Sequence, residues 1–128
     1  MRNKTILIVD DDPYVRLGTS LRLKANGYAT LFAGDAPTAL KEAEEHRPDL
    51  IMLDLGLPGD DGFLVIETLK ALPSLALIPI IVVSGRDIRA NQARAIEAGA
   101  NAFLQKPVDN VEFLAVIRRA LGEAVLTG

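Results

Sequence analysis

Residues 49–54, DLIMLD, are the stretch that decides the fold of this chain. The apolar residues 50–53 stand on consecutive positions, which is the pattern of a strand buried on both faces of a parallel sheet. Residues 55–62, which follow Asp54, contain three glycines and a proline and therefore predict a loop. The stretch thus predicts a central strand that delivers a carboxylate to a loop at its end.

Other short apolar runs flank this stretch and alternate with segments of helical periodicity. Strands are expected at residues 5–9, 29–33, 50–53, 79–83 and 102–105. Helices are expected at residues 13–26, 35–45, 63–72 and 87–98, and from the cap Asp109 to about residue 121. This alternation predicts an α/β fold with a parallel sheet and helices on both faces. Five strands in 128 residues favour the flavodoxin-like doubly wound (βα)5 arrangement of order 2-1-3-4-5.

The composition indicates one domain. The chain has 128 residues, no cysteine and a net charge of −3, so we expect a single domain over residues 1–128, with its core at about 5–121 and no output domain. The lack of cysteine excludes disulfides and thiolate metal sites. The acidic balance disfavours direct nucleic-acid binding, and no apolar run is long enough to span a membrane. A cytoplasmic protein is the simplest expectation.

Polar side chains stand directly after several of the expected strands, namely Asp10, Asp11, Asp54, Ser84 and Lys106. Ligands of open α/β sheets bind beyond the carboxyl ends of the strands, near the point where the strand order reverses. Carboxylates gathered there would repel one another unless a cation lies among them, and oxygen ligands beside phosphate chemistry suit Mg²⁺. The pattern therefore predicts phosphoryl transfer to a carboxylate, stabilised by a metal, an ammonium and a hydroxyl.

As a set, the motifs ILIVDDDP, DLIMLDLGLPGDDG, PIIVVSG and GANAFLQKPV closely resemble the receiver domain of bacterial two-component response regulators. The resemblance covers the chain from about residue 5 to 121. It implies that Asp54 accepts a phosphoryl group from a sensor histidine kinase or a histidine phosphotransfer protein. It also implies a signalling protein that assists its own phosphorylation and dephosphorylation, and not a turnover enzyme.

The resemblance implies a role for each matching residue. The ligands of Mg²⁺ or Mn²⁺ would be Asp10, Asp11, Asp54 and the backbone carbonyl of Gly56. Ser84 and Lys106 would contact the phosphoryl group. Ser84 and Phe103 match the pair of residues that switches on phosphorylation, and the bond before Pro107 is expected to be cis. Gly56 and Arg86 match positions that tune the phosphoryl lifetime.

The signal is expected to leave through the surface formed by the helix at 87–98, the strand at 102–105 and the last helix. This part of the chain is rich in arginine, with Arg86, Arg89, Arg94, Arg118 and Arg119. We expect a downstream protein partner there, and either a monomer or a dimer that forms on phosphorylation. His46, near the end of the helix at 35–45, is expected to be an exposed residue without a role in the site.

Three other functions stay open on sequence alone. An Mg²⁺-dependent phosphohydrolase would commonly carry a second aspartate two residues after the nucleophile, where this chain has Gly56. A flavodoxin-like FMN carrier would need a loop rich in hydroxyls and glycines at residues 10–12, where this chain has three aspartates. A pseudo-receiver, which would act as a phosphate-independent adaptor, is opposed by the complete set of site residues.

Overall fold

The computed structural model describes residues 3–58, 61–85 and 88–123. In these ranges strands and helices alternate in the order β1 (Thr5–Val9), α1 (Pro13–Ala25), β2 (Ala29–Ala33), α2 (Ala36–His46), β3 (Leu50–Asp54), α3 (Asp61–Ala71), β4 (Ile80–Ser84), α4 (Ile88–Ala98), β5 (Ala102–Gln105) and α5 (Asn110–Ala120). The strands form one sheet of order β2-β1-β3-β4-β5 in which every neighbouring pair is parallel. The expected doubly wound fold is confirmed.

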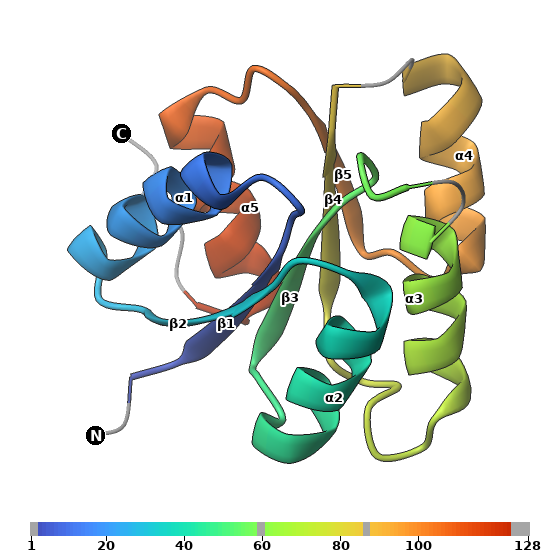
Figure 1. Cartoon of the computed structure of the whole chain (residues 1–128). Helices are drawn as coiled ribbons and strands as arrows, with labels where there is room; N and C mark the ends of the chain where they lie inside the picture. The colour runs from blue at the N-terminus through green and yellow to red at the C-terminus, as the bar shows by residue number, and fades with distance from the viewer. Residues whose placement is uncertain (1–2, 59–60, 86–87, 124–128) are drawn as a thin grey trace.

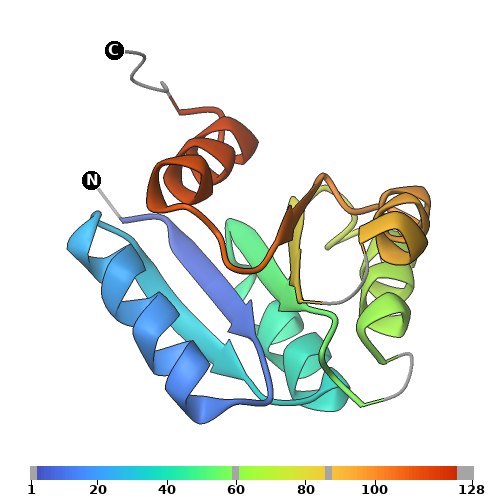
Figure 2. The ribbon, with the colours of Figure 1, turned by 90° about the horizontal axis from the view of Figure 1, so that it is seen from above.

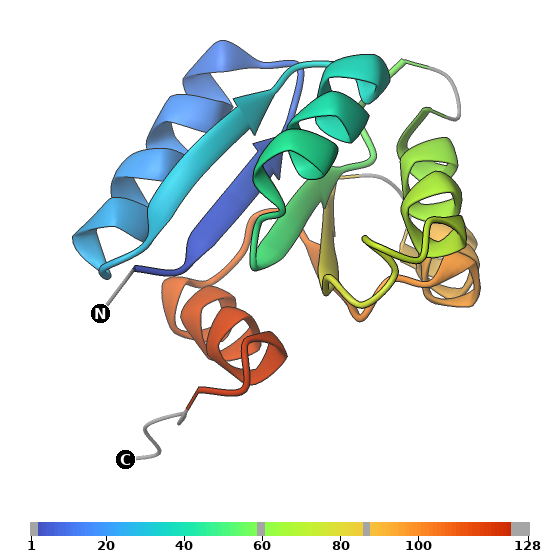
Figure 3. The same cartoon turned by 90° about the horizontal axis from the view of Figure 1, so that it is seen from below.

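Helices cover both faces of the sheet. Helices α1 and α5 lie on one face and α2, α3 and α4 on the other (Figure 1). Views from above and below show the sheet between these two layers (Figures 2 and 3). Alternate residues of each strand belong to the two cores, so that Ile51 and Leu53 pack toward α2 and α3, while Met52 packs toward α1 and α5.

Aspartates begin three of the helices and explain why these segments start where they do. The Asp12 carboxylate accepts hydrogen bonds from the backbone N–H groups of Tyr14 and Val15, and Pro13 occupies the first helical turn of α1. Asp35 and Asp109 cap α2 and α5 in the same way. Asp12 is therefore a helix cap, and this places Asp10 and Asp11 in the short turn between β1 and α1.

The start of α3 differs most from the sequence expectation, and the other helix ends lie within one residue of it. Helix α3 begins at Asp61, where the glycine-rich pattern predicted a loop as far as residue 62. Gly62 is buried in the first turn of α3, where an added Cβ would lie 2.9 Å from Leu55 Cδ2. This glycine therefore serves close packing and not a turn. Helix α1 ends at Ala25, because Asn26 leaves the helical conformation as its cap.

None of the helices within the described ranges is long and apolar enough to cross a bilayer.

Candidate functional site

The register of the sheet brings the strand-end residues to one edge. Val9 of β1 stands opposite Leu53 of β3. The residues that follow them, Asp10 and Asp54, therefore lie side by side at the carboxyl ends of the two strands. Asp54 stands opposite Val83 in β4, and Ser84 stands opposite Gln105 in β5. Lys106 follows directly and donates its backbone N–H to the Ser84 carbonyl at 2.8 Å. One edge therefore carries two carboxylates, a hydroxyl and an ammonium.

Lys106 connects the two aspartates. Its Nζ lies 2.5 Å from Asp54 Oδ2 and 3.7 Å from Asp10 Oδ2. The Lys106–Pro107 peptide bond is cis. The structure thus joins residues from the first, third and fifth strands in one ionic cluster, which is the convergence that the sequence pattern required.

Asp10 is the more deeply buried carboxylate, with 4% of the residue exposed. Its Oδ1 accepts a hydrogen bond from the Asp12 N–H at 2.9 Å. The pKa of Asp10 is raised to about 6, because burial and the neighbouring Asp54 outweigh the lowering effects of the Asp12 N–H and Lys106. Asp10 is thus a carboxylate whose negative charge is incompletely balanced by the protein.

Asp54 is ionised more readily than Asp10. Burial raises its pKa, but the hydrogen bonds from Lys106 and the Gly56 N–H outweigh this effect, and the pKa lies below its ordinary value. The Gly56 N–H donates to Asp54 Oδ1 at 2.6 Å. Burial alone would lower the pKa of Lys106, but Asp54 and Asp10 raise it overall. The Asp54–Lys106 pair is therefore charged, and a proton at this edge goes to Asp10.

A small hollow of about 40 Å³ explains the desolvation of the cluster. Asp10, Asp54 and Lys106 line it together with side chains from the sheet, α1 and α5, namely Ile8, Val9, Val15, Thr19, Met52, Val83 and Phe113. Nearly all of these walls are apolar and offer the charges no hydrogen bond. The low polarity strengthens every electrostatic interaction in the cluster.

Gly56 lies unusually close to the carboxylate. A Cβ at this position would lie 3.0 Å from Asp54 Oδ1, so a side chain there would press on the oxygen that accepts the Gly56 N–H. This contact is made by the N–H of Gly56, whereas the family resemblance implies a role for its carbonyl as a metal ligand. The absence of a side chain keeps the approach to Asp54 open.

The remaining predicted site residues occupy different surroundings. Ser84 is fully buried at the end of β4. Phe103 is partly buried and packs against the core on the side of α2, α3 and α4. Asp11 is exposed beside Asp10. Arg86 lies outside the described residues, so its expected role in the phosphoryl lifetime stays a prediction.

Arg16 is a neighbour of the site that the sequence reasoning missed. Its Nη1 donates to the Asp10 backbone carbonyl at 3.0 Å and occupies the space beside Gly34, where an added Cβ would lie 2.6 Å from it. Arg16 thus fixes the turn that holds Asp10. Its position one helical turn after Asp12 was the available signal, because residues four apart share a helix face.

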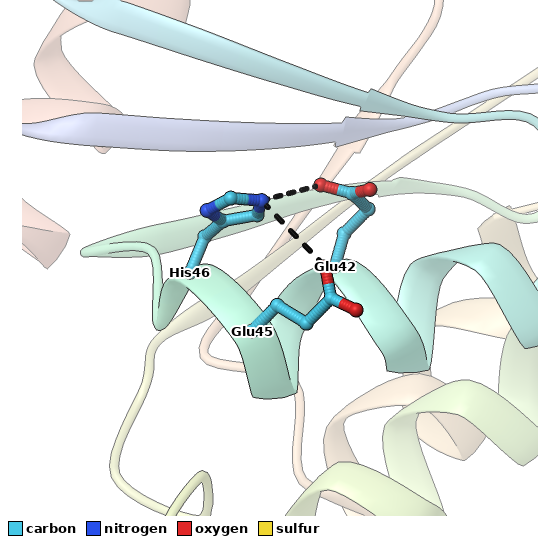
Figure 4. Close-up of side chains that lie close together, drawn as sticks. All are labelled: Glu42, Glu45 and His46. Carbon is cyan, nitrogen blue, oxygen red and sulfur yellow. Dashed lines mark ion pairs between the residues drawn. The ribbon is translucent and has the colours of Figure 1, made fainter.

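A second cluster of ionisable side chains lies on α2 (Figure 4). His46 Nε2 lies 3.4 Å from Glu42 Oε2 and 3.9 Å from Glu45 Oε2. The side chains of His46 and Glu45 are 50% and 52% exposed. His46 ends α2, ahead of the first residue of β3, so this cluster is far from the carboxyl edge of the sheet. His46 is therefore an exposed helix-end residue in a surface ion pair.

Comparisons with known proteins agree with this geometry. Residues 6–118 match the response regulator receiver domain family. The polar-differentiation response regulator DivK of Brucella anthropi is 34% identical over 122 residues, which are 94% of this chain and 98% of DivK. The response regulator PleD of Caulobacter vibrioides is 41% identical over 114 residues, but the match covers only 25% of PleD. The chain likewise spans half of the transcriptional regulatory protein KdpE of Mycobacterium tuberculosis.

Solved structures show the same fold. A CheY-like receiver domain protein from Methanospirillum hungatei superposes with a TM-score of 0.86 at 30% identity, over 94% of this chain and 95% of the other. The receiver domain of the sensor histidine kinase PA1611 from Pseudomonas aeruginosa has a TM-score of 0.86 at 27% identity and covers 95% of this chain and all of its own; it is described with a magnesium ion in its active-site cleft. Together with the charged cluster and the family match over most of its length, these likenesses show that the chain belongs to the response regulator receiver domain family.

Proposed function

We propose that Asp54 is the phospho-acceptor of this chain and takes its phosphoryl group from a histidine kinase or a histidine phosphotransfer protein. Receiver domains are signalling modules of two-component systems, and not turnover enzymes. The observation that carries the proposal is the ion pair between Lys106 and Asp54, formed next to the buried Asp10. An ionised carboxylate with a cation at hand is what phosphoryl transfer to aspartate requires.

The chemistry follows from the charge state of the cluster. The low pKa of Asp54 keeps it ionised, so that one of its oxygens can form the bond to phosphorus. The bond from phosphorus to the donor breaks at the same time, and its electron pair leaves with the donor. Lys106 then stands next to the oxygens on which negative charge collects, and its ammonium stabilises that charge.

The acidic side chains suit a divalent cation. We assign Mg²⁺, or Mn²⁺ in its place, to Asp10, Asp11, Asp54 and the carbonyl of Gly56. Support comes from the donor set, which contains oxygen only, and from the raised pKa of Asp10, which marks a charge that one lysine does not balance. When bound, the ion would supply positive charge to the phosphoryl oxygens.

The signal would pass from the site to the α4–β5–α5 surface. Ser84 lies buried at the end of β4, and Phe103 lies partly buried on the neighbouring strand. We propose that Ser84 binds the phosphoryl group and that Phe103 repacks in response. The exposed apolar side chains of Ile96 and Val111, 45% and 75% exposed, give this surface groups that a protein partner could cover. The phosphorylated protein then acts as a monomer or as a dimer.

Incubation with Mg²⁺ and acetyl phosphate tests the proposal, with intact-mass spectrometry as the readout. We expect a single added phosphoryl group on the wild type and on Asp61→Asn, a control at a nearby aspartate. Asp54→Asn should stay unlabelled. A label that persists in Asp54→Asn would show that the acceptor is misassigned. Steady hydrolysis of many equivalents of a small phosphoester would instead indicate a phosphohydrolase.

A further inference from the structure

The two layers of helices each contain an arginine stacked on a phenylalanine. In the first pair Arg94 of α4 lies over the ring of Phe63 in α3, with Cζ 3.8 Å from the ring centroid. In the second pair Arg22 of α1 lies over Phe113 of α5 at 4.6 Å. Both distances are within the range of a cation–π attraction. The pairs have the same chemistry but connect different helices.

Residues 89–98 of α4 bury little side-chain area in the core. Among residues 89–98 only the small side chain of Ala95 is buried. Helix α3, by contrast, buries Phe63, Val65, Ile66 and Leu69. Because buried apolar area holds a helix in place, residues 89–98 give α4 a much weaker hold on the sheet. A stacking contact that ties α4 to the well-buried α3 can therefore contribute to fixing the position of α4.

Arg94 stands between two open hollows on the α3–α4 surface. One, of about 430 Å³, is lined by Arg94, Glu67, Glu97 and Ala98. The other, of about 260 Å³, is lined by Arg94 with Asp61, Phe63, Leu64 and Glu67. Arg94 and Glu67 line both hollows, so the guanidinium reaches Phe63 next to open space on the α3–α4 surface.

The pair also connects the two segments that leave the phosphorylation edge. Phe63 lies in the first turn of α3, the helix that follows Asp54 along the chain, and Arg94 lies in α4, the helix that follows Ser84. A movement that draws Ser84 toward a phosphoryl group on Asp54 would pull the chain that leads into α4. A stacking contact depends steeply on distance, so a shift of α4 relative to α3 would weaken it.

We propose that Arg94 is a latch that holds α4 against α3 in the unphosphorylated protein and so limits how readily phosphorylation moves the α4 surface. This inference rests on the proposed function of Asp54. A contact that is present in only one of two states favours that state, and its removal raises the apparent affinity of a ligand that selects the other. Arg94 is thus a positioning residue that acts on the site through α4.

The test is a titration of the Mg²⁺-loaded protein with beryllofluoride, followed by NMR signals of Ala95 and Ser84. In Arg94→Met the apolar part of the side chain remains and the charge is lost, and we expect binding about two- to fivefold tighter than in the wild type. The affinity of Arg94→Lys for beryllofluoride should lie between those of the wild type and Arg94→Met. Arg22→Met removes the matching contact between α1 and α5 and should leave the affinity unchanged.

Hydrogen exchange without any ligand gives a second readout. The α4 amides should exchange faster in Arg94→Met than in the wild type or in Arg22→Met. Equal affinities and equal exchange in the wild type and in Arg94→Met would overturn the latch. An equal gain in beryllofluoride affinity in Arg22→Met would also overturn the latch, because the gain would then come from general destabilisation of the protein. Failure of the wild type to bind beryllofluoride, or unchanged binding in Asp54→Asn, would instead overturn the proposed function and the latch with it.

Discussion

Two clusters of ionisable side chains lie at opposite ends of the sheet, and they differ in burial more than in composition. Asp10, Asp54 and Lys106 meet at the carboxyl ends of the strands. Glu42, Glu45 and His46 meet on α2, near the start of β3 (Figure 4). Each cluster has two carboxylates and one basic group, and each has a carboxylate within hydrogen-bond or ion-pair distance of that group.

Burial turns only the first cluster into a coupled system. Asp10 is 4% exposed and shares apolar walls with Asp54, so each charge affects the proton affinity of the others. Glu45 and His46 are half exposed, and water screens their interaction. The three side chains on α2 come from one helix, whereas those of the site come from three strand ends. Similar residues thus give a buried cluster of interacting charges in one place and a surface ion pair in the other.

Loss of the lysine should give the largest effect. Lys106→Met removes the only ammonium in contact with Asp54 in the described part of the chain. We expect phosphorylation by acetyl phosphate to slow by about 100-fold, the loss typical of one charge-stabilising donor. The rate is followed by intact-mass spectrometry at a fixed Mg²⁺ concentration. Lys41→Met, an exposed lysine of α2 near the second cluster, serves as the control. A slowing of less than about threefold in Lys106→Met would contradict the role of the ammonium.

Asp10→Asn should stabilise the metal-free protein, in contrast to most substitutions of buried residues. The pKa of Asp10 rises from its ordinary 3.8 to about 6 on folding, so the folded protein binds this proton more tightly than the unfolded chain. Its favourable contribution is complete below pH 3.8 and is lost as the pH rises through 6. At pH 8 we therefore expect Asp10→Asn to raise the free energy of unfolding by about 1 to 3 kcal/mol.

Urea unfolding at several pH values measures this effect. The gain should shrink as the pH falls from 6 toward 4, because the wild-type Asp10 then becomes neutral as well. Added Mg²⁺ should narrow the difference at pH 8, since it stabilises the wild type more than a variant that has lost a ligand. If Asp10→Asn were less stable than the wild type at pH 8 without metal, the negative charge of Asp10 would be well balanced by its neighbours. This would contradict the raised pKa of Asp10.

The sequence predicted those features that depend on one strand and its end. Apolar runs indicate the strands, and their alternation with helices indicates a parallel sheet. Five strands favour the order that brings Asp10, Asp54 and Lys106 to one edge. Contacts between helices could not be predicted from the sequence. The stacking of Arg94 on Phe63 depends on how α4 lies against α3, and residue spacing within each helix does not determine that distance.

The start of α3 shows a second limit. Glycine at position 62 and proline at 58 are typical of a loop, and the pattern gave no sign that Gly62 is needed for close packing on Leu55. The composition of a segment reports its turn propensity, but not the tertiary space into which the segment must fit.

Substitution in the surface cluster of Glu42, Glu45 and His46 should have the smallest effect. His46→Gln removes a pair between Glu42 and an imidazole that is half exposed and charged only when protonated. Exposed pairs of this spacing stabilise helices by about 0.2 to 0.5 kcal/mol, so we expect an equally small loss of the free energy of unfolding in urea. Phosphorylation should proceed at the wild-type rate, because α2 carries these residues to the end of the sheet away from Asp54. A loss of stability above about 1 kcal/mol, or a slower phosphorylation, would mean that the difference in exposure does not separate the two clusters.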